Sequence, residues 1–288
     1  MLQPPAALAP EQDAGPRSIA PAVVFDKVSF AFDDHVVLSD VSFAIPDGSM
    51  KVLLGASGAG KSIVLKLILG LLRPDNGAIW VKGQRIDTLP ERDLIRARAD
   101  IGMLFQGSAL FDSLTVAENV GYRLYEETRM PADQVRRRVE EVLAFVGLSE
   151  HIDRMPAELS GGQRRRVAIA RAMIGRPSLL LFDDPTTGLD PIIATTVNNE
   201  IVKLRDLEHA TSIVVTHQIR DAYYVATHEA VRHNGTVIIR PIGEERARQV
   251  GFMVLHDARI YFEGTAGELL ASSDSYLRRF LFRTLPPW

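Results

Sequence analysis

The chain has 288 residues, of which 46% are hydrophobic and 24% are charged. This is the composition of a globular protein, and it excludes a mainly disordered or fibrous chain. Because the sequence has no cysteine, it excludes disulfide scaffolds, thiol nucleophiles and cysteine-ligated zinc. The 33 Lys and Arg against 36 Asp and Glu give a net charge of −3. That balance argues against a global polyanion-binding surface and leaves a local basic patch open.

No segment predicts a membrane span, which needs a run of about 18 or more apolar residues. The most apolar stretch, Ile63 to Leu72, carries Lys66 and is expected to be a buried helix. Residues 1–21 are rich in Pro and Ala but lack the basic and apolar regions of a signal peptide. We therefore expect a flexible N-terminal tail.

The first part of the chain after this tail predicts strands separated by turn residues. The short strand-like runs are 23–30, 36–38, 41–45, 51–54, 78–81 and 84–86. The run 51–54 ends at a glycine-rich turn, and a helical pattern follows from Lys61. This order of strand, turn and helix is typical of an α/β fold.

The later part of the chain alternates helices with buried strands, after a charged helical stretch at about 108–160. The expected elements are helix 162–174, strand 178–182, helix 191–207 and strand 211–216. Such alternation predicts a parallel sheet with helices on its faces, and the helical stretch is then an inserted lobe.

A phosphate-binding loop is the first motif that carries chemistry. It comprises Gly55, Ala56, Ser57, Gly58, Ala59, Gly60, Lys61 and Ser62, and it matches G-x-x-x-x-G-K-[ST]. Its glycines let backbone N–H groups converge on phosphate oxygens at a helix N-terminus. Lys61 would reach the β- and γ-phosphates, and the Ser62 hydroxyl would ligate Mg²⁺. A glycine-rich turn without a ligand is the alternative.

The second motif is an apolar strand, 179–182, that ends in Asp183 and Asp184. A carboxylate at the carboxyl end of a buried strand lies beside the phosphate loop, where Asp183 can orient Mg²⁺. The alternative is a carboxylate that is simply solvated.

The third motif, Leu159–Gln163, places a serine and two glycines at the start of a helix. A hydroxyl with free backbone N–H groups forms an anion site, whereas the simpler reading is an N-cap. Two chains packed head-to-tail could combine this site with the phosphate loop on one nucleotide.

Six motifs together resemble the ATPase subunits of ABC transporters, over about residues 23–270. They are, in order, the phosphate loop, Gln106, Leu159–Gln163, the strand ending in Asp183-Asp184, Gly188–Asp190 and Thr216-His217. The resemblance implies a phosphate-loop NTPase with a β-rich nucleotide-binding lobe, a RecA-like parallel-sheet core and an inserted helical lobe. It also implies ATP and Mg²⁺ as ligands.

The resemblance also implies roles for single residues. Phe32 would stack on the adenine, although a core or edge aromatic is the alternative. Gln106 would contact Mg²⁺, sense the γ-phosphate and link to the membrane partner, and His217 would contact the γ-phosphate. Asp190 belongs to a loop that crosses the dimer interface. The residues that would bind the γ-phosphate on the opposite subunit are Ser160, Gly161, Gly162 and Gln163.

One position departs from the family, which normally has a glutamate after the metal-orienting aspartate. Here Asp184 is one methylene shorter, so its reach to an in-line water falls by about an ångström, and such errors cost about a hundredfold in rate. We expect slow hydrolysis. A weakly hydrolysing regulatory subunit is the alternative that this substitution opens.

Within the family, the stretches 106–116, 184–192 and 272–281 are similar to ATPases of bacterial lipid transporters of the Mla or Mkl type, which work with MCE-domain proteins. The expected partners are a second copy of the chain, permease subunits and an MCE-domain protein, at the cytoplasmic face of the inner membrane. The alternative is the ATPase of an importer for polar solutes. Soluble DNA-repair or translation members carry two cassettes or a long coiled coil, which argues against them.

Two arginine triplets, 136–138 and 164–166, raise the possibility of nucleic-acid binding. Neither is interleaved with aromatic residues. The first has Glu140 and Glu141 as helical partners and is expected to be a solvated face, and the second belongs to the helix after Leu159–Gln163. We expect no nucleic-acid partner.

The expected domain is 22–270, with a helical lobe at about 108–160 and a C-terminal tail at 271–288. An extension at about 228–251 carries Asn234-Gly235, a strong hairpin signal, followed by a polar run at 243–249. A second strand hairpin is expected at 252–256 and 259–262. The extension either lengthens a sheet edge or docks a partner, and it is expected to lie outside the ATP site.

Overall fold

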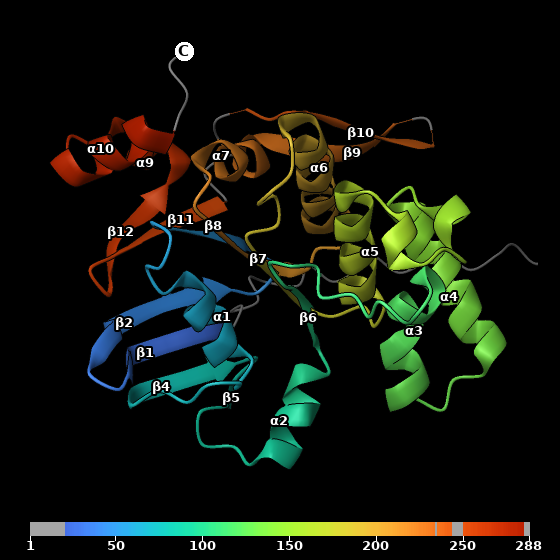
Figure 1. Cartoon of the computed structure of the whole chain (residues 1–288). Helices are drawn as coiled ribbons and strands as arrows, with labels where there is room; N and C mark the ends of the chain where they lie inside the picture. Colours follow the sequence, from blue (N-terminus) through green and yellow to red (C-terminus); the bar gives the residue numbers. More distant parts are fainter. Residues whose placement is uncertain (1–20, 234, 244–249, 285–288) are drawn as a thin grey trace, which may run out of the picture.

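The computed structural model describes residues 21–233, 235–243 and 250–284, and a six-stranded sheet forms its centre (Figure 1). The strand order is β12-β11-β3-β8-β7-β6, and all neighbours pair in parallel except β12, which is antiparallel to β11. The strands are β3 (Met50–Leu54), β6 (Ile101–Leu104), β7 (Leu179–Asp183), β8 (Thr211–Thr216), β11 (Val250–His256) and β12 (Arg259–Thr265). The predicted α/β fold with a parallel sheet is confirmed.

This sheet is covered on both faces, and β7 shows how the sequence achieves that. Its side chains alternate between the two hydrophobic clusters of the core, with Leu179 and Leu181 in one and Leu180 and Phe182 in the other. The first cluster includes the apolar face of α1 (Lys61–Ile68) and the second that of α5 (Gly161–Met173). Because both faces are buried, every position of β7 except its terminal aspartate is apolar.

A four-stranded antiparallel sheet with the order β2-β1-β4-β5 packs against the first cluster. Its strands are β1 (Pro21–Phe32), β2 (His35–Pro46), β4 (Asn76–Val81) and β5 (Gln84–Arg85). The runs expected as separate strands at 36–38 and 41–45 form one strand instead. Asp40 joins them with a positive φ of 54°, and its N–H donates to the Ser29 hydroxyl at 3.0 Å, so the strand continues across a local irregularity.

Helices cover the other side of the central sheet, and together with α5 they include α6 (Pro191–Leu207) and α7 (Ile219–Thr227). The stretch 108–160, which is expected as a helical lobe, contains α3 (Val116–Glu127), α4 (Ala132–Phe145) and the 3₁₀ turns Ser149–His151 and Pro156–Glu158. Strand β6 and helix α2 (Glu91–Arg98) were not expected, because each is short and has weak periodicity. None of the helices in the described ranges is long and apolar enough to cross a membrane.

The C-terminal part contains two hairpins and two helices. β9 (His228–His233) and β10 (Thr236–Pro241) pair as the hairpin signal predicts, although Asn234 and residues 244–249 lie outside the described residues. Of the expected tail 1–21, residues 1–20 also lie outside the described residues, and Pro21 begins β1. The hairpin of β11 and β12 is confirmed, but β11 also pairs with β3 and so belongs to the central sheet.

The segment expected as a C-terminal tail contains a packed helix. After α9 (Ala266–Ala271), α10 (Ser275–Thr284) buries Leu277 and Phe280. The ring of Tyr276 stacks on that of His256, with centroids 3.6 Å apart. Because His256 ends β11, this stack joins α10 to the central sheet.

We predict that Gly102→Ala destabilises the fold, because β6 lies against α5 with no space for a side chain. An added Cβ would overlap the Ala172 carbonyl oxygen and lie 2.7 Å from Leu180 Cδ2. Such overpacking costs about 1–3 kcal/mol. Urea unfolding measures the change, and Gly107→Ala is the control, because an added Cβ there meets no atom within 4 Å. Equal stability of both variants would contradict this packing.

Candidate functional site

The phosphate loop connects the carboxyl end of β3 to α1, as the sequence predicts. Gly58 and Gly60 have φ angles of 80° and 97°, which side chains rarely adopt, and a Cβ on Gly60 would lie 2.7 Å from Val37 Cγ1. Lys61 Nζ donates to the carbonyl oxygens of Gly55 at 3.0 Å and Ala56 at 2.9 Å. The ammonium is thereby held inside the curve of the loop.

The electrostatic environment of Lys61 suits the binding of an anion. Burial lowers the pKa of Lys61, and the charges of Asp184 and Asp183 counteract that shift. The side chain is largely desolvated, so its attraction to a phosphate is less screened than at the surface.

Asp183 and Ser62 meet beside the loop, and their oxygens are the ones expected to hold a metal ion. The Ser62 hydroxyl donates to Asp183 Oδ1 at 2.8 Å. Asp183 is only 6% exposed, so the alternative of a simply solvated carboxylate is wrong. Burial raises the pKa of Asp183, as does Asp184, whereas the Ser62 hydrogen bond and Lys61 lower it. The described residues contain no cluster of three or more His, Asp or Glu side chains that could hold a metal ion.

Asp184 and His217 form a close pair at the same edge of the sheet. Asp184 Oδ1 accepts from the His217 backbone N–H at 3.2 Å and lies 2.9 Å from His217 Nδ1. Asp184 has a φ of 43°, and its N–H donates to the Val215 carbonyl at 2.8 Å. The short carboxylate is therefore held against the histidine, while His217 stays partly exposed.

Gln106 and Phe32 are exposed and sit at the ends of their strands. Gln106 lies two residues beyond Leu104, which pairs with Phe182, so Gln106 follows β6 at the edge where Asp183 ends β7. Phe32 ends β1 and packs edge-on against Phe30, with centroids 4.9 Å apart.

A cavity of about 600 Å³ adjoins the phosphate loop and has a size typical of ligand pockets. Its lining comes from three segments, namely 35–39 of β2, 56–59 of the loop and 255–259 of the β11–β12 turn. The turn was not expected to contribute, since only the pairing of β11 with β3 brings His256 to the loop. Phe32 is not among the residues that line this cavity.

Ser160 caps the N-terminus of α5, so the simpler reading of Leu159–Gln163 is correct as far as it goes. The Ser160 hydroxyl accepts from Gln163 N–H at 3.3 Å, and Gln163 Oε1 accepts from Ser160 N–H at 2.8 Å. Ser160 and Gly161 are exposed, while a Cβ on Gly162 would overlap Ile193 Cγ2. Asp190 likewise caps α6 by accepting from Ile192 and Ile193 N–H groups.

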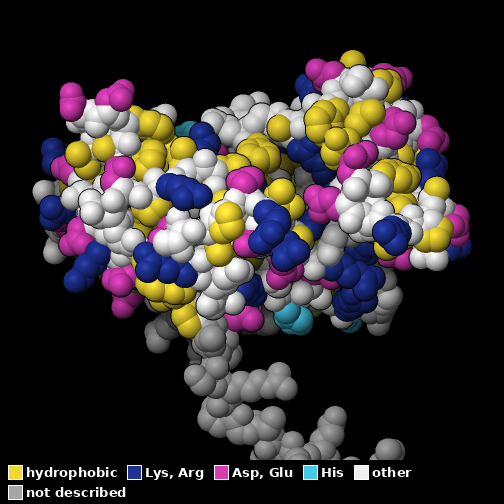
Figure 2. All heavy atoms as spheres, turned by 90° about the horizontal axis from the view of Figure 1, so that it is seen from below, with side chains coloured by type: hydrophobic (Ala, Val, Ile, Leu, Met, Phe, Trp, Pro, Cys, Tyr) yellow, Lys and Arg dark blue, Asp and Glu magenta, His cyan; other side chains and the backbone are white. Residues whose placement is uncertain are grey.

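The arginine triplets are engaged within the chain. Arg136 and Arg138 bond Glu140 and Glu141, which confirms the expected pairing on α4. All three residues of 164–166 donate to main-chain carbonyl oxygens. On the face seen in Figure 2, basic and acidic side chains are interspersed.

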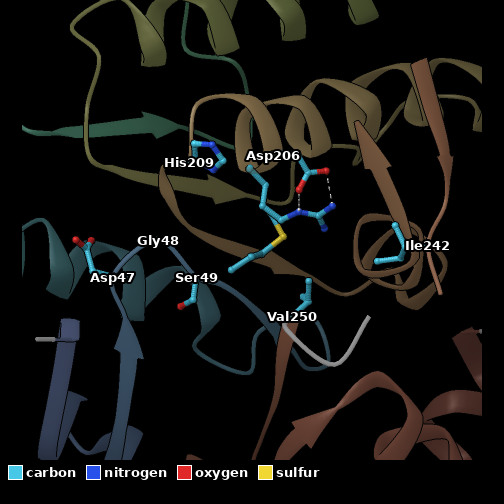
Figure 3. Close-up of a pocket in the computed structure, with 9 residues that line it drawn as sticks. Asp47, Gly48, Ser49, Asp206, His209, Ile242 and Val250 are labelled. Carbon is cyan, nitrogen blue, oxygen red and sulfur yellow. Dashed lines mark hydrogen bonds and ion pairs between the residues drawn. The ribbon is translucent and has the colours of Figure 1, made fainter. Parts of the chain in front are cut away.

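Another cavity, of about 320 Å³, lies at the opposite end of the central strands (Figure 3). It opens beside Met50 and Val250, where β3 and β11 begin. Its lining includes Asp206, whose carboxylate forms an ion pair with the Arg205 guanidinium at 2.8 Å. Arg205 also donates to the carbonyl oxygens of Val225 and His228. The charges of Arg205 and Asp206 are thus engaged by groups of the chain itself. Ligands of parallel sheets bind at the carboxyl ends of the strands, which is the opposite end from this cavity.

The comparisons with known proteins agree with this geometry. Residues 38–187 match the family model described as ABC transporter. The chain is 33% identical to the intermembrane phospholipid transport system ATP-binding protein MlaF of Escherichia coli K12, over 92% of this chain and 90% of that protein. It is 41% identical to the sulfate/thiosulfate import ATP-binding protein CysA of Gloeobacter violaceus, over 75% of this chain and 61% of that protein.

A solved dimeric structure of the ATP-binding cassette MJ0796, in a post-hydrolysis state with ADP and Pi, is similar in fold. The TM-score is 0.70 at 28% identity, over 84% of this chain and 98% of that chain. The chain belongs to the ABC transporter family and is an ATPase subunit that binds and hydrolyses ATP.

We predict that Lys61→Ala weakens ATP binding at least tenfold, because it removes the buried cation at the centre of the loop. The control is Lys66→Ala, which removes an exposed lysine from the same helix and should leave affinity unchanged within about twofold. Titration with ATP by calorimetry measures both. Unchanged affinity of the Lys61 variant would contradict the role of the loop.

Proposed function

We propose that the chain hydrolyses Mg²⁺-ATP at the edge where the phosphate loop, Asp183, Asp184 and His217 converge, and so energises lipid transport through membrane permease subunits. The observation that carries the chemistry is the pair of contacts Ser62–Asp183 and Asp184–His217 beside Lys61. They bring a phosphate-binding cation, a metal-binding pair and a carboxylate to one side of one sheet.

In this proposal, Ser62, Asp183 and Gln106 would hold Mg²⁺, and the ion would supply positive charge that offsets the charge of the phosphates. Their fit rests on the donor set: a hydroxyl and a carboxylate oxygen already lie 2.8 Å apart, and Mg²⁺ prefers oxygen ligands. Lys61 binds the phosphates, and the exposed face of His217 contacts the γ-phosphate.

Asp184 orients the attacking water and accepts its proton. The contact with His217 fixes its carboxylate on one side, but the side chain lacks the methylene that the family's glutamate has. We propose that hydrolysis is slow for this reason, since positioning errors of about an ångström cost about a hundredfold. The alternative is a regulatory subunit that mainly binds ATP.

We predict that Asp184→Asn abolishes turnover and leaves ATP affinity within about threefold, because an amide cannot accept the proton. Asp184→Glu should raise kcat if the short side chain limits the rate. Steady-state hydrolysis and ATP titration of the three proteins separate the cases. If Asp184→Asn turns over at the original rate, Asp184 has no catalytic role. If Asp184→Glu is slower than the original protein, the backbone at this position, which has a positive φ, is adapted to Asp.

The active sites are proposed to be composite, with Ser160, Gly161, Gly162 and Gln163 of one copy completing the phosphate loop of the other. Support comes from the exposed N-terminus of α5 and from the dimeric MJ0796 cassette. Asp190 would lie in the loop between the two copies, and Phe32 would stack on the adenine.

We predict that a mixture of Lys61→Ala and Ser160→Arg chains is active although each variant alone is inactive. In a mixed dimer, one site carries both changes and the other carries none. The unchanged site retains turnover. The measurement is hydrolysis at fixed total protein across mixing ratios, with Lys66→Ala plus Ser160→Arg as control. Full activity of a strictly monomeric preparation would contradict composite sites.

Lipid is proposed as the cargo because the similarity to MlaF spans 92% of this chain, whereas that to CysA spans 75%. The greater identity to CysA supports the alternative of a polar-solute importer.

We propose a homodimer bound to permease subunits at the cytoplasmic face of a bacterial inner membrane, with an MCE-domain protein as a further partner and no nucleic acid. The proposed ATPase domain is 22–270, with its helical lobe at about 108–160 and its extension at about 228–251.

The permease is proposed to dock beside Gln106, Leu110 and Phe111. Phe111 is 44% exposed and packs against the exposed ring of Tyr122 at 4.8 Å. The main chain of Phe111 is held on both sides by Asn119, so its ring is presented outward from a fixed backbone.

We predict that Phe111→Asp weakens co-purification with the permease at least tenfold, because a charge enters an apolar contact, without changing ATP affinity. Ile95→Asp changes an exposed apolar residue on α2 and should leave the association intact. Reconstitution of the complex in vesicles then tests the cargo. Movement of a water-soluble substrate with no movement of lipid would favour the importer alternative.

A further inference from the structure

Arg165 is a buried arginine whose single guanidinium joins three segments of the site. It lies on α5, about one turn beyond Ser160, and is only 5% exposed. One terminal nitrogen donates to the carbonyl oxygens of Phe105 at 3.1 Å and Gln106 at 2.6 Å. The other donates to the carbonyl oxygen of Thr187 at 3.2 Å. The loop after β6 and the turn after β7 are thus tied to the same helix.

The Thr187 end of this link leads directly to the catalytic carboxylate. Thr187 N–H donates to the Asp184 carbonyl at 3.2 Å, so the turn that Arg165 holds is the one that sets the Asp184 backbone. Burial lowers the pKa of Arg165, and the charge of Asp184 counteracts that shift. The guanidinium is therefore coupled to the turn through both a hydrogen bond and a charge.

Two polar atoms at this link are buried without a hydrogen-bond partner, namely Arg165 Nε and Thr187 Oγ1. A buried donor or acceptor left unpaired costs about 1–3 kcal/mol. The link therefore rests on the two terminal nitrogens of Arg165, which make all three carbonyl contacts.

We propose that Arg165 is a positioning residue for ATP hydrolysis, which holds the main chain of Gln106 in register with the turn of Asp184. A displacement of the Gln106 loop is then passed to both the turn and the N-terminus of α5. This inference rests on the proposed role of Gln106 in hydrolysis.

Arg171 provides a matched control on the same helix. It is partly buried, and its guanidinium donates to the carbonyl oxygens of Ala109 at 2.7 Å and Ser108 at 2.8 Å. Both acceptors lie in the Gln106 loop. A change at Arg171 therefore removes equivalent hydrogen bonds without removing the connection to Thr187.

The first test compares kcat, KM for ATP and thermal stability of full-length Arg165→Gln, Arg165→Lys and Arg171→Gln. We expect Arg165→Gln to lower kcat at least tenfold with KM within about threefold, because the phosphate loop is untouched while Gln106 loses its register with the turn of Asp184. Arg165→Lys keeps the charge and one carbonyl bond and should recover part of kcat. Arg171→Gln should lose similar stability and keep kcat within about threefold. Equal losses of kcat in both Gln variants, or a rise in KM alone, would overturn the proposal.

The second test combines Arg165→Gln with Gln106→Ala. If Arg165 acts through Gln106, its effect on kcat largely disappears in that background. An undiminished effect overturns the inference. If Gln106→Ala alone leaves kcat unchanged, the proposed role of Gln106 fails instead.

Hydrogen exchange tests, independently of turnover, whether Arg165 links the Gln106 loop to the Thr187 turn. Arg165→Gln should speed amide exchange both at 105–108 and at 187–189, whereas Arg171→Gln should speed it only at the first. Arg165→Lys is measured in the same way if the Gln variant does not fold. Unchanged exchange at 187–189 in the Arg165 variants would show that no such link exists.

Discussion

The site depends on the in-register parallel pairing of β3, β8 and β7. Leu54 pairs with Thr216 and Asp183 pairs with Val215, so the phosphate loop, Asp184 and His217 all leave the sheet at one edge. The hydrogen bond from Asp184 N–H to the Val215 carbonyl carries this alignment one residue beyond the strand. Because both faces of these strands are buried, a slip in register would exchange core residues between two clusters.

The charged groups Lys61, Asp183 and Asp184 at this edge are buried and hydrogen-bonded within the chain. Lys61 is held by two carbonyl oxygens, Asp183 by Ser62 and Asp184 by His217. Leaving one such group without its partner would cost several kcal/mol. Preorganised groups need little rearrangement when a phosphate enters, which is the usual source of electrostatic catalysis.

Helix α5 connects this edge with the rest of the molecule. Its first residues form an N-cap in which Ser160 and Gly161 are exposed, while the Gln163 N–H donates to the Ser160 hydroxyl. One turn later, Arg165 reaches the Gln106 loop and the Thr187 turn, and Arg171 reaches the same loop. Helix α5 is therefore tied by hydrogen bonds both to the Gln106 loop and to the Thr187 turn.

The sequence by itself determined the elements and motifs that local chemistry specifies. Glycines that need positive φ, a capping serine and apolar strands located the phosphate loop, the start of α5 and β7, and α6 and β8 have the predicted bounds. The tertiary structure alone decided where distant segments meet. β11 pairs with β3, about 200 residues earlier in the chain, and brings His256 to the cavity, whereas its local pattern indicated only a hairpin. Arg165 reads as one member of a basic triplet, because a hydrogen bond to a carbonyl oxygen leaves no signal in the identity of the residue that supplies it.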